Sequence, residues 1–245
     1  MKQSFFKIIG NEKIAERSWR MRLEGDLSEI AGSGQFVQVC LPGFYLRRPI
    51  SVCSVDGDVL TLVYRVVGKG TEAMSGFRNG DSIELITGLG HGFDPEACAK
   101  SALLVGGGCG IAPLYELAKE LFAMGKDVTA ILGFNNEAEI MLVDEFKALG
   151  ANVVITTADG SVGVKGFVTD AIRSMNPQCD CFYTCGPRVM MKAVSEMLSC
   201  SGEVSLEEKM GCGFGICFGC SIQTAKGPKQ VCKDGPVFKK EDVIW

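Results

Sequence analysis

The chain has 245 residues, 47% of them hydrophobic and 22% charged, and it carries a formal net charge of −4 at pH 7. This composition is ordinary for a globular protein with a real core, and the length favours one large domain or two modest ones. No run of lysine and arginine is dense enough to indicate a nucleic-acid partner. The apolar patch after Met1 is broken by Lys7, and no apolar run reaches the ~18 residues of a membrane span. We therefore expect a cytoplasmic protein with no membrane partner.

The first part of the chain, from Met1 to about Cys98, is predicted to form short strands separated by turns. Apolar runs cover residues 34–41, 48–55, 59–67 and 81–87. The turn signals DGD and NGD separate some of these runs. Many short strands with close turns are typical of an antiparallel β-barrel, which we expect over residues 1–98.

From Ser101 the pattern changes to strands that alternate with helices. Predicted strands cover residues 102–107, 127–134, 152–158 and 180–186, and predicted helices cover residues 113–123, 143–150, 166–175 and 187–199. Alternation at this spacing predicts a doubly wound parallel sheet, which we assign to residues 99–202. Residues 203–245 remain as a short tail rich in cysteine and glycine, with little periodicity.

The tail contains the most specific motif of the sequence. Gaps of four, two and eleven residues separate Cys212, Cys217, Cys220 and Cys232. In a reducing compartment, clustered cysteines indicate metal ligands or redox groups more than a disulfide framework. A gap of four followed by a gap of two is the plant-type ligand order for a 2Fe–2S cluster, so the tail is predicted to be an iron–sulfur module. Structural zinc, which usually uses two CxxC pairs, and simple packing are the alternatives.

The glycines between these cysteines fit the same prediction. Gly211, Gly213, Gly215 and Gly219 permit unusual backbone angles, and they let N–H groups approach sulfur atoms that accept hydrogen bonds. The other eight cysteines are scattered, several of them in apolar runs, and we expect them to pack as small hydrophobes. They are Cys40, Cys53, Cys98, Cys109, Cys179, Cys181, Cys185 and Cys200.

A glycine-rich loop follows the first predicted strand of the sheet and begins a helix. Its sequence is VGGGCGIAP, in which Gly108, Gly110 and Pro113 hold the key positions. Glycines here let the backbone approach a pyrophosphate, whose charge the helix N-terminus favours. The loop lacks the final glycine of the full dinucleotide motif and has no obvious acidic residue about twenty positions on. An ordinary tight turn is therefore the alternative.

A second turn strengthens the nucleotide prediction. The last predicted strand of the sheet ends in Cys185, Gly186 and Pro187. Ligands of open parallel sheets bind beyond the carboxyl ends of the strands, where both turns lie. Together they are predicted to frame one nicotinamide nucleotide. Cys185 is either a direct contact or a plain buried thiol.

The predicted barrel contains two segments suited to a dinucleotide. In LRRPISV, Arg48 supplies a planar fork that matches a diphosphate, and Ser51 supplies a further donor. Farther on, Tyr64 is an aromatic side chain able to lie on a flat ring, and Gly70 and Thr71 begin a short helical stretch. An edge strand with solvated arginines is the alternative interpretation.

In this order, the motifs RPIS, GT, GGGCGIAP and CGP resemble the ferredoxin-reductase family. The cysteine tail and the late stretch VCKDGPVF narrow the resemblance to the electron-transfer subunits of type B dihydroorotate dehydrogenase. The resemblance runs along essentially the whole chain. Cys109, inside the glycine loop, departs from the family pattern and makes oxidation a hazard there.

The resemblance implies an NAD-dependent oxidoreductase subunit of pyrimidine biosynthesis with three cofactor sites. A barrel that binds FAD, a sheet domain that binds NAD and a 2Fe–2S module ligated by the four tail cysteines are expected. FAD, which exchanges one or two electrons, would link the one-electron cluster to the two-electron nicotinamide. The implied FAD contacts are Arg48, Pro49, Ile50, Ser51, Val63, Tyr64, Arg65, Gly70 and Thr71.

The resemblance also implies a partner. This is an FMN-containing subunit that oxidises dihydroorotate, in a heterotetramer with two copies of each chain. No catalytic acid or base is expected on this chain. The lone histidine, His91, is expected to be a loop or interface residue, and Asp159 to Ser161 either touch the nucleotide ribose or form a surface turn. A flavin subunit of another complex, such as a ferredoxin:NADP transhydrogenase or a sulfide-linked reductase, and a zinc-stabilised binding module are the alternative functions.

Overall fold

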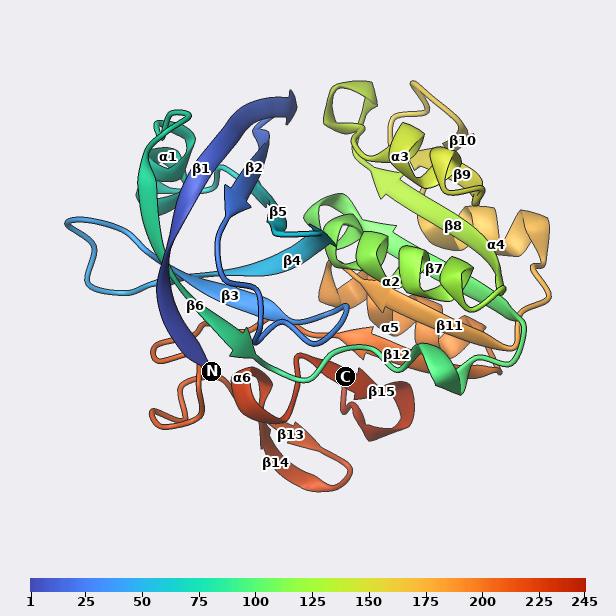
Figure 1. The fold of residues 1–245 in the computed structure, drawn as a ribbon. Helices are drawn as coiled ribbons and strands as arrows, with labels where there is room; N and C mark the ends of the chain where they lie inside the picture. Colours follow the sequence, from blue (N-terminus) through green and yellow to red (C-terminus); the bar gives the residue numbers. More distant parts are fainter.

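A closed β-barrel forms the first part of the chain in the computed structural model, which describes residues 1–245 (Figure 1). Its strands are β1 (Lys2–Ala15), β2 (Ser18–Glu24), β3 (Phe36–Cys40), β4 (Arg48–Asp56), β5 (Val59–Arg65) and β6 (Ser82–Leu89). They follow the antiparallel order β1-β2-β5-β4-β3-β6, which confirms the predicted barrel. The four predicted strands correspond to β3 to β6. The short helix α1 (Lys69–Ser75) follows β5, as the sequence predicts.

Strand alternation decides which barrel residues face the core. In β3, Val37 and Val39 lie in the barrel core, whereas Phe36 packs in a different cluster outside the barrel. In β5, Leu62 and Tyr64 lie in the barrel core, while Val63 contacts the neighbouring domain. Because successive side chains of a strand point to opposite faces, each strand thus serves two packing surfaces.

The second part of the chain forms a seven-stranded sheet in the order β10-β9-β8-β7-β11-β12-β15. The strands are β7 (Ser101–Gly107), β8 (Asp127–Phe134), β9 (Asn152–Thr157), β10 (Val164–Lys165), β11 (Cys181–Cys185), β12 (Ser201–Ser205) and β15 (Val237–Lys239). All neighbours pair in parallel except β15, which is antiparallel to β12. This arrangement confirms the predicted parallel sheet and adds one antiparallel edge strand from the tail.

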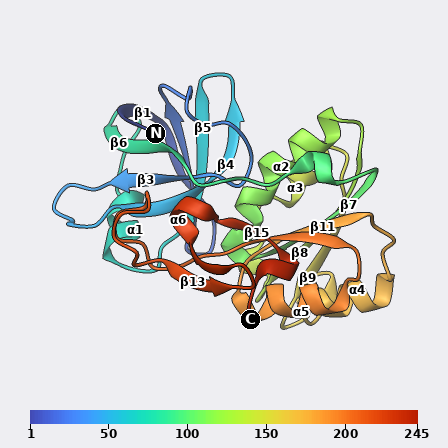
Figure 2. The same ribbon diagram turned by 90° about the horizontal axis from the view of Figure 1, so that it is seen from below.

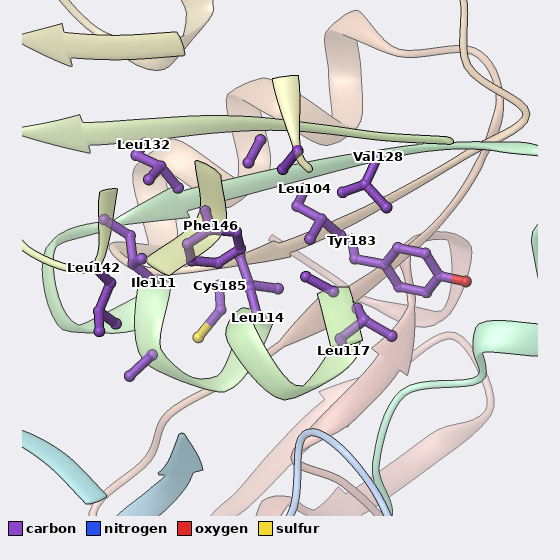
Figure 3. Packing of buried hydrophobic residues seen from close by; sticks show 14 of the residues in the cluster. Leu104, Ile111, Leu114, Leu117, Val128, Leu132, Leu142, Phe146, Tyr183 and Cys185 are labelled. Atoms are coloured by element: carbon purple, nitrogen blue, oxygen red, sulfur yellow. The ribbon is translucent and has the colours of Figure 1, made fainter. Parts of the chain in front are cut away.

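Helices cover both faces of this sheet (Figure 2). The helices are α2 (Ala112–Ala123), α3 (Val143–Ala148), α4 (Val168–Met175) and α5 (Arg188–Met197). Leu104 of β7 packs with residues of α2 and α3, whereas Leu103 and Val105 pack with residues of α4 and α5. Figure 3 shows the first of these cores, with Leu114 and Leu117 of α2 beside Leu104. The doubly wound architecture is therefore confirmed.

The cysteine-rich tail packs against both preceding units. It contains the hairpin β13 (Ser221–Thr224) and β14 (Gly227–Gln230), followed by α6 (Val231–Asp234). A third core cluster joins Phe36 and Ile86 of the barrel to Cys220 and Cys232 of the tail. The division into residues 1–98, 99–202 and 203–245 stays a prediction, and β12, which belongs to the sheet, crosses residue 202.

The structure corrects one expectation about the scattered cysteines. Cys98, in the connection between barrel and sheet, forms a disulfide with Cys181 of β11, and their Cα atoms are 5.4 Å apart. The expectation that these two only pack is wrong, because the fold brings together residues separated by 83 positions. The Sγ atoms of Cys179 and Cys200 lie 3.5 Å apart as free thiols. No helix in the structure is both long and apolar enough to cross a membrane.

Candidate nucleotide and iron–sulfur cluster sites

A cavity of about 700 Å³ lies at the carboxyl edge of the sheet. The glycine loop 107–110 and the turn residues Gly186 and Pro187 line it from β7 and β11. Gly133 and Thr156, near the ends of β8 and β9, line the next part of the same edge. The two turns that the sequence singled out thus face one cavity, as expected for a nucleotide site at this edge.

The two turns touch each other so closely that only glycine fits between them. A Cβ atom on Gly110 would overlap the backbone of Cys185 and Gly186. Gly108 and Gly186 have φ angles of +55° and +146°, in the region that favours glycine. The part of the cavity wall that these two turns form is therefore main chain, which lets a ligand approach the backbone closely.

Two residues of the predicted nucleotide set do not present their side chains to the cavity. Cys185 is 1% exposed and packs in the core with Ile111 and Leu114 (Figure 3). Burial raises the pKa of its thiol far above the ordinary value. Pro113 is buried in the first turn of α2. The structure therefore supports the plain buried thiol, and Cys185 shapes the site through its backbone.

Charged side chains line the cavity beside the glycine loop. Arg65 of the barrel forms an ion pair with Glu139, which comes from the segment after β8. Burial alone would raise the pKa of Glu139, but hydrogen bonds from Arg65 and Asn135 outweigh burial and keep this pKa below its usual value. The ionised pair thus ties the barrel to the sheet at the cavity mouth.

Glu207, two residues after the end of β12, also lines the cavity. Burial raises the pKa of its carboxyl group. Glu207, Glu139 and Phe167, which is 68% exposed at the start of α4, were missed by the sequence analysis. These residues reach the cavity only because distant chain segments meet at the sheet edge, and no local sequence pattern predicts which segments meet there.

The barrel forms a second candidate site around Arg48. The guanidinium of Arg48 lies against Gly70, where a Cβ atom would overlap it, and 5.1 Å from the centre of the Phe44 ring. Its Nη1 atom donates to the carbonyl of Leu46, and no carboxylate lies within salt-bridge distance. Arg48 and Gly70, from separate segments, thus form a cationic cradle that fits the diphosphate of FAD.

The structure changes the roles of two other predicted FAD residues. Tyr64 is 2% exposed in the barrel core, and its hydroxyl donates to Asn11 Oδ1 at 3.0 Å. Its side chain cannot lie on a flavin ring, so the stacking prediction is wrong; strand alternation points it inward. The Thr71 hydroxyl accepts from the N–H of Val67 at 2.9 Å and is committed to its own loop. Only the main chain of these residues remains available to FAD.

Pro49, Ile50 and Ser51 follow Arg48 along β4 and are half-buried, while Val63 is buried against the sheet domain. They lie on adjacent strands, because β4 pairs with β5. Their contacts with FAD stay a prediction.

The cysteine loop is built as a cradle for sulfur. Backbone N–H groups hydrogen-bond to three of the four sulfurs: Cys212 N to Cys217 Sγ at 3.4 Å, Phe214 N to Cys212 Sγ at 3.5 Å and Cys232 N to Cys220 Sγ at 3.4 Å. Gly213 and Gly215 have φ angles of +85° and +91°, as the glycine pattern predicts.

The loop favours thiolates at its outer end. Burial opposes the ionisation of Cys212, but N–H groups that donate to its sulfur outweigh burial and lower its pKa to about 6. Cys217 is exposed, whereas Cys220 and Cys232 are each 2% exposed. Nowhere in the structure do three or more His, Cys, Asp or Glu side chains surround a point that a single metal ion could occupy. Four thiols, three of which accept hydrogen bonds from backbone N–H groups, fit the donor set of an iron–sulfur cluster.

Two further sequence expectations lie outside these sites. The carboxylate of Asp159 accepts from the N–H and the hydroxyl of Ser161, at 2.9 and 2.7 Å, so it forms a surface turn and does not line the cavity. His91 lies in a loop, and its backbone N–H donates to the carbonyl of Gly235 at 2.6 Å. Its side chain is exposed and its main chain contacts the tail, so His91 is a loop residue, as expected.

A barrel with a cationic cradle, a doubly wound sheet with a glycine-walled cavity and a four-cysteine loop define an oxidoreductase of the ferredoxin-reductase class. The family model for the oxidoreductase NAD-binding domain matches residues 104–196. The model for the iron–sulfur cluster binding domain of dihydroorotate dehydrogenase B matches residues 207–244. The chain belongs to the family of dihydroorotate dehydrogenase B electron transfer subunits.

Full-length relatives support this assignment. The dihydroorotate dehydrogenase B (NAD(+)) electron transfer subunit of a Geobacillus species is 42% identical over 257 aligned residues, covering 100% of this chain and 99% of the relative. The corresponding subunit of Fusobacterium nucleatum is 40% identical and covers 95% of each chain. Among solved structures, a chain of the NADH-dependent reduced ferredoxin-NADP oxidoreductase is 34% identical with a TM-score of 0.90, covering 99% of this chain and 90% of that one.

Proposed function

We propose that this chain is the electron-transfer subunit of a dihydroorotate dehydrogenase B complex and delivers electrons from dihydroorotate to NAD+. Bound FAD and a 2Fe–2S cluster supply the conversion between one-electron transfer and hydride transfer. The chain's own residues bind and orient these groups. The observation that carries the proposal is the direct packing of the cysteine loop on the flavin barrel, through the core shared by Cys220, Cys232, Phe36 and Ile86.

Each site has a separate task. Arg48 and Gly70 hold the FAD diphosphate, and Cys212, Cys217, Cys220 and Cys232 hold the cluster. Gly108, Gly110, Gly186 and Pro187 wall the nicotinamide site, and the pair of Arg65 and Glu139 closes the gap between the barrel and the sheet. Oriented backbone donors at this wall favour the negative pyrophosphate of NAD.

The partner is a catalytic subunit that contains FMN and oxidises dihydroorotate, in a heterotetramer with two copies of each chain. The family name supports a catalytic partner, since it describes an electron transfer subunit. The exposed Cys217 supports electron exchange at that end of the loop, because a surface ligand shortens the distance to a second protein. The division of residues into barrel (1–98), sheet (99–202) and cluster module (203–245) is part of this proposal.

A second function is favoured by one observation. The structural match at a TM-score of 0.90 is to a chain of the NADH-dependent reduced ferredoxin-NADP oxidoreductase. In that alternative the same cofactors would serve a complex that uses reduced ferredoxin instead of dihydroorotate. The higher identity of the dihydroorotate dehydrogenase B subunits, at 39–42%, favours the first function.

Co-purification separates the two functions. The tagged chain, isolated from its own cells, is expected to retain an FMN protein, and the isolated complex is expected to reduce NAD+ with dihydroorotate. Visible absorption by flavin and iron–sulfur is expected as well, and its absence would support a zinc module. Retention of a ferredoxin-dependent partner without dihydroorotate activity would overturn the proposed function.

A further inference from the structure

The glutamine at position 38 lies on the outer face of the flavin barrel and is nevertheless fully buried. Its neighbours Val37 and Val39 point into the barrel core, so strand alternation points Gln38 outward. The exposed fraction of Gln38 is 0%. In the sheet, β3 places Gln38 beside Pro49 of β4 and Ile86 of β6. Pro49 belongs to the motif assigned to FAD, and Ile86 to the core shared with Cys220 and Cys232.

The cysteine loop is what covers Gln38. A Cβ atom on Gly213 would overlap the carboxamide, and Nε2 lies 4.0 Å from Met210 Sδ. Gly213 directly follows Cys212, the first ligand position of the loop. The side chain therefore connects the strand next to the flavin motif with the segment that begins the cluster loop.

The buried carboxamide of Gln38 has no strong hydrogen-bond partner. Oε1 has no hydrogen-bond partner, and the sulfur of Met210 is a weak acceptor for Nε2. A buried amide without partners lowers the stability of the folded state. Gln35, just before β3, shows the contrast: its Nε2 donates to Gly90 O at 3.2 Å and its Oε1 accepts from Ala31 N at 2.7 Å. A sulfur acceptor bound at the cysteine loop would satisfy the N–H donors of Nε2, whereas Oε1 needs a donor from elsewhere.

We propose that Gln38 is a positioning residue of the iron–sulfur site, holding the Met210–Gly213 segment against the flavin barrel and donating a side-chain N–H to the sulfur atoms of the cluster. This inference rests on the proposed function, since it requires the four cysteines to hold a cluster. Hydrogen bonds to cluster sulfurs stabilise the reduced form, which carries more negative charge. Gln38 thereby raises the reduction potential of the cluster, so a residue of the flavin barrel sets part of that potential.

The test replaces Gln38 with methionine, which keeps the length and removes both N–H donors. In the full complex, Gln38→Met should lower the reduction equilibrium of the cluster about tenfold, or about 59 mV for one electron. Electron paramagnetic resonance of the reduced cluster should show altered g-values. Gln38→Glu, which keeps the shape and adds negative charge, should lower the potential further. The matched control is Gln35→Met, which should reduce thermal stability and leave the cluster spectrum unchanged.

The outcomes separate this inference from the proposed function. Wild-type protein without an iron–sulfur signal would contradict the proposed function itself. A wild-type cluster whose potential and g-values are unchanged in both Gln38→Met and Gln38→Glu would show that Gln38 only packs, and would overturn the inference. A shift in flavin absorption or FAD affinity with an unchanged cluster would also overturn it, because the carboxamide would then serve FAD.

Discussion

The cysteine loop and the nucleotide cavity hold their groups in opposite ways. In the loop, three ligands lie within nine residues, and the N–H donors to Cys212 and Cys217 come from the loop itself. The cavity is assembled from the ends of β7, β8, β9 and β11, and its wall depends on the contact between Gly110 and Cys185. A substitution in the cysteine loop should therefore remove the bound group alone. A substitution in the cavity wall should both weaken nucleotide binding and lower the stability of the sheet domain. Variants of the two regions should thus differ in what they lose.

Replacing Cys217 with serine should abolish the cluster and spare the rest of the protein. Cys217 is exposed, so its loss removes a thiolate ligand without opening the core. The iron–sulfur absorption bands should disappear while FAD stays bound and the midpoint of thermal unfolding of the barrel stays close to that of wild type. Cys40→Ser, a half-buried thiol of β3, is the control and should keep the cluster. Equal loss of flavin in Cys217→Ser would mean that the loop is a structural element of the barrel.

Replacing Arg48 with alanine should weaken FAD binding strongly. A guanidinium on a partly desolvated diphosphate is a charge-assisted pair, and truncating such a pair costs about 2–5 kcal/mol, or about 30- to several-thousand-fold in affinity. Equilibrium dialysis measures the flavin retained. Arg173→Ala removes an exposed ion pair with Asp170 and should retain FAD fully. Stoichiometric FAD in Arg48→Ala would show that the cradle against Gly70 is only a surface feature.

Replacing Gly110 with alanine should damage both the nucleotide site and the stability of the sheet domain. The new Cβ must displace the backbone of Cys185 and Gly186, and a displacement of about 1 Å costs about 10²-fold in rate. NADH oxidation with ferricyanide should fall by about that factor, and the thermal midpoint should fall too. Gly125→Ala has a φ of +72° and open space around its Cβ, so it should lower stability slightly and leave NADH oxidation intact. Normal rates in Gly110→Ala would show that the contact between the turns is dispensable.

The smallest expected effect is on stability and concerns Glu203 of β12, the sheet strand that precedes the cysteine loop. Burial raises the pKa of Glu203 from 4.5 to about 6, although its carboxylate accepts from Asp94 N at 2.9 Å. Because the folded state binds this proton more tightly, the ionised carboxylate reduces stability above pH 6, and this cost disappears as the pH falls through the window from 6 to 4.5. Glu203→Gln should therefore stabilise the protein by about 1 kcal/mol at pH 8 and by nothing at pH 4.5. Equal thermal shifts at both pH values would contradict the buried charge.

The same contrast explains what could be predicted from the sequence. The spacing of Cys212, Cys217, Cys220 and Cys232 is local, so it predicts the cysteine loop and its positive-φ glycines directly. The strands and helices of the sheet domain follow from their periodicity. Glu139, Glu207 and Phe167 were missed because the tertiary fold alone brings them to the cavity. Tyr64 was misjudged because the direction of a strand residue depends on register, which the sequence did not reveal.

The central claim is that the nucleotide site oxidises NADH without the cluster, whereas electron transfer from the catalytic subunit requires the cluster. The most direct measurement compares Cys220→Ser with wild type in two assays, NADH oxidation by ferricyanide and dihydroorotate-dependent reduction of NAD+ with the catalytic subunit present. We predict that the variant keeps most of the first activity and loses the second. Dihydroorotate-dependent NAD+ reduction at wild-type rates by the Cys220→Ser complex would contradict the account.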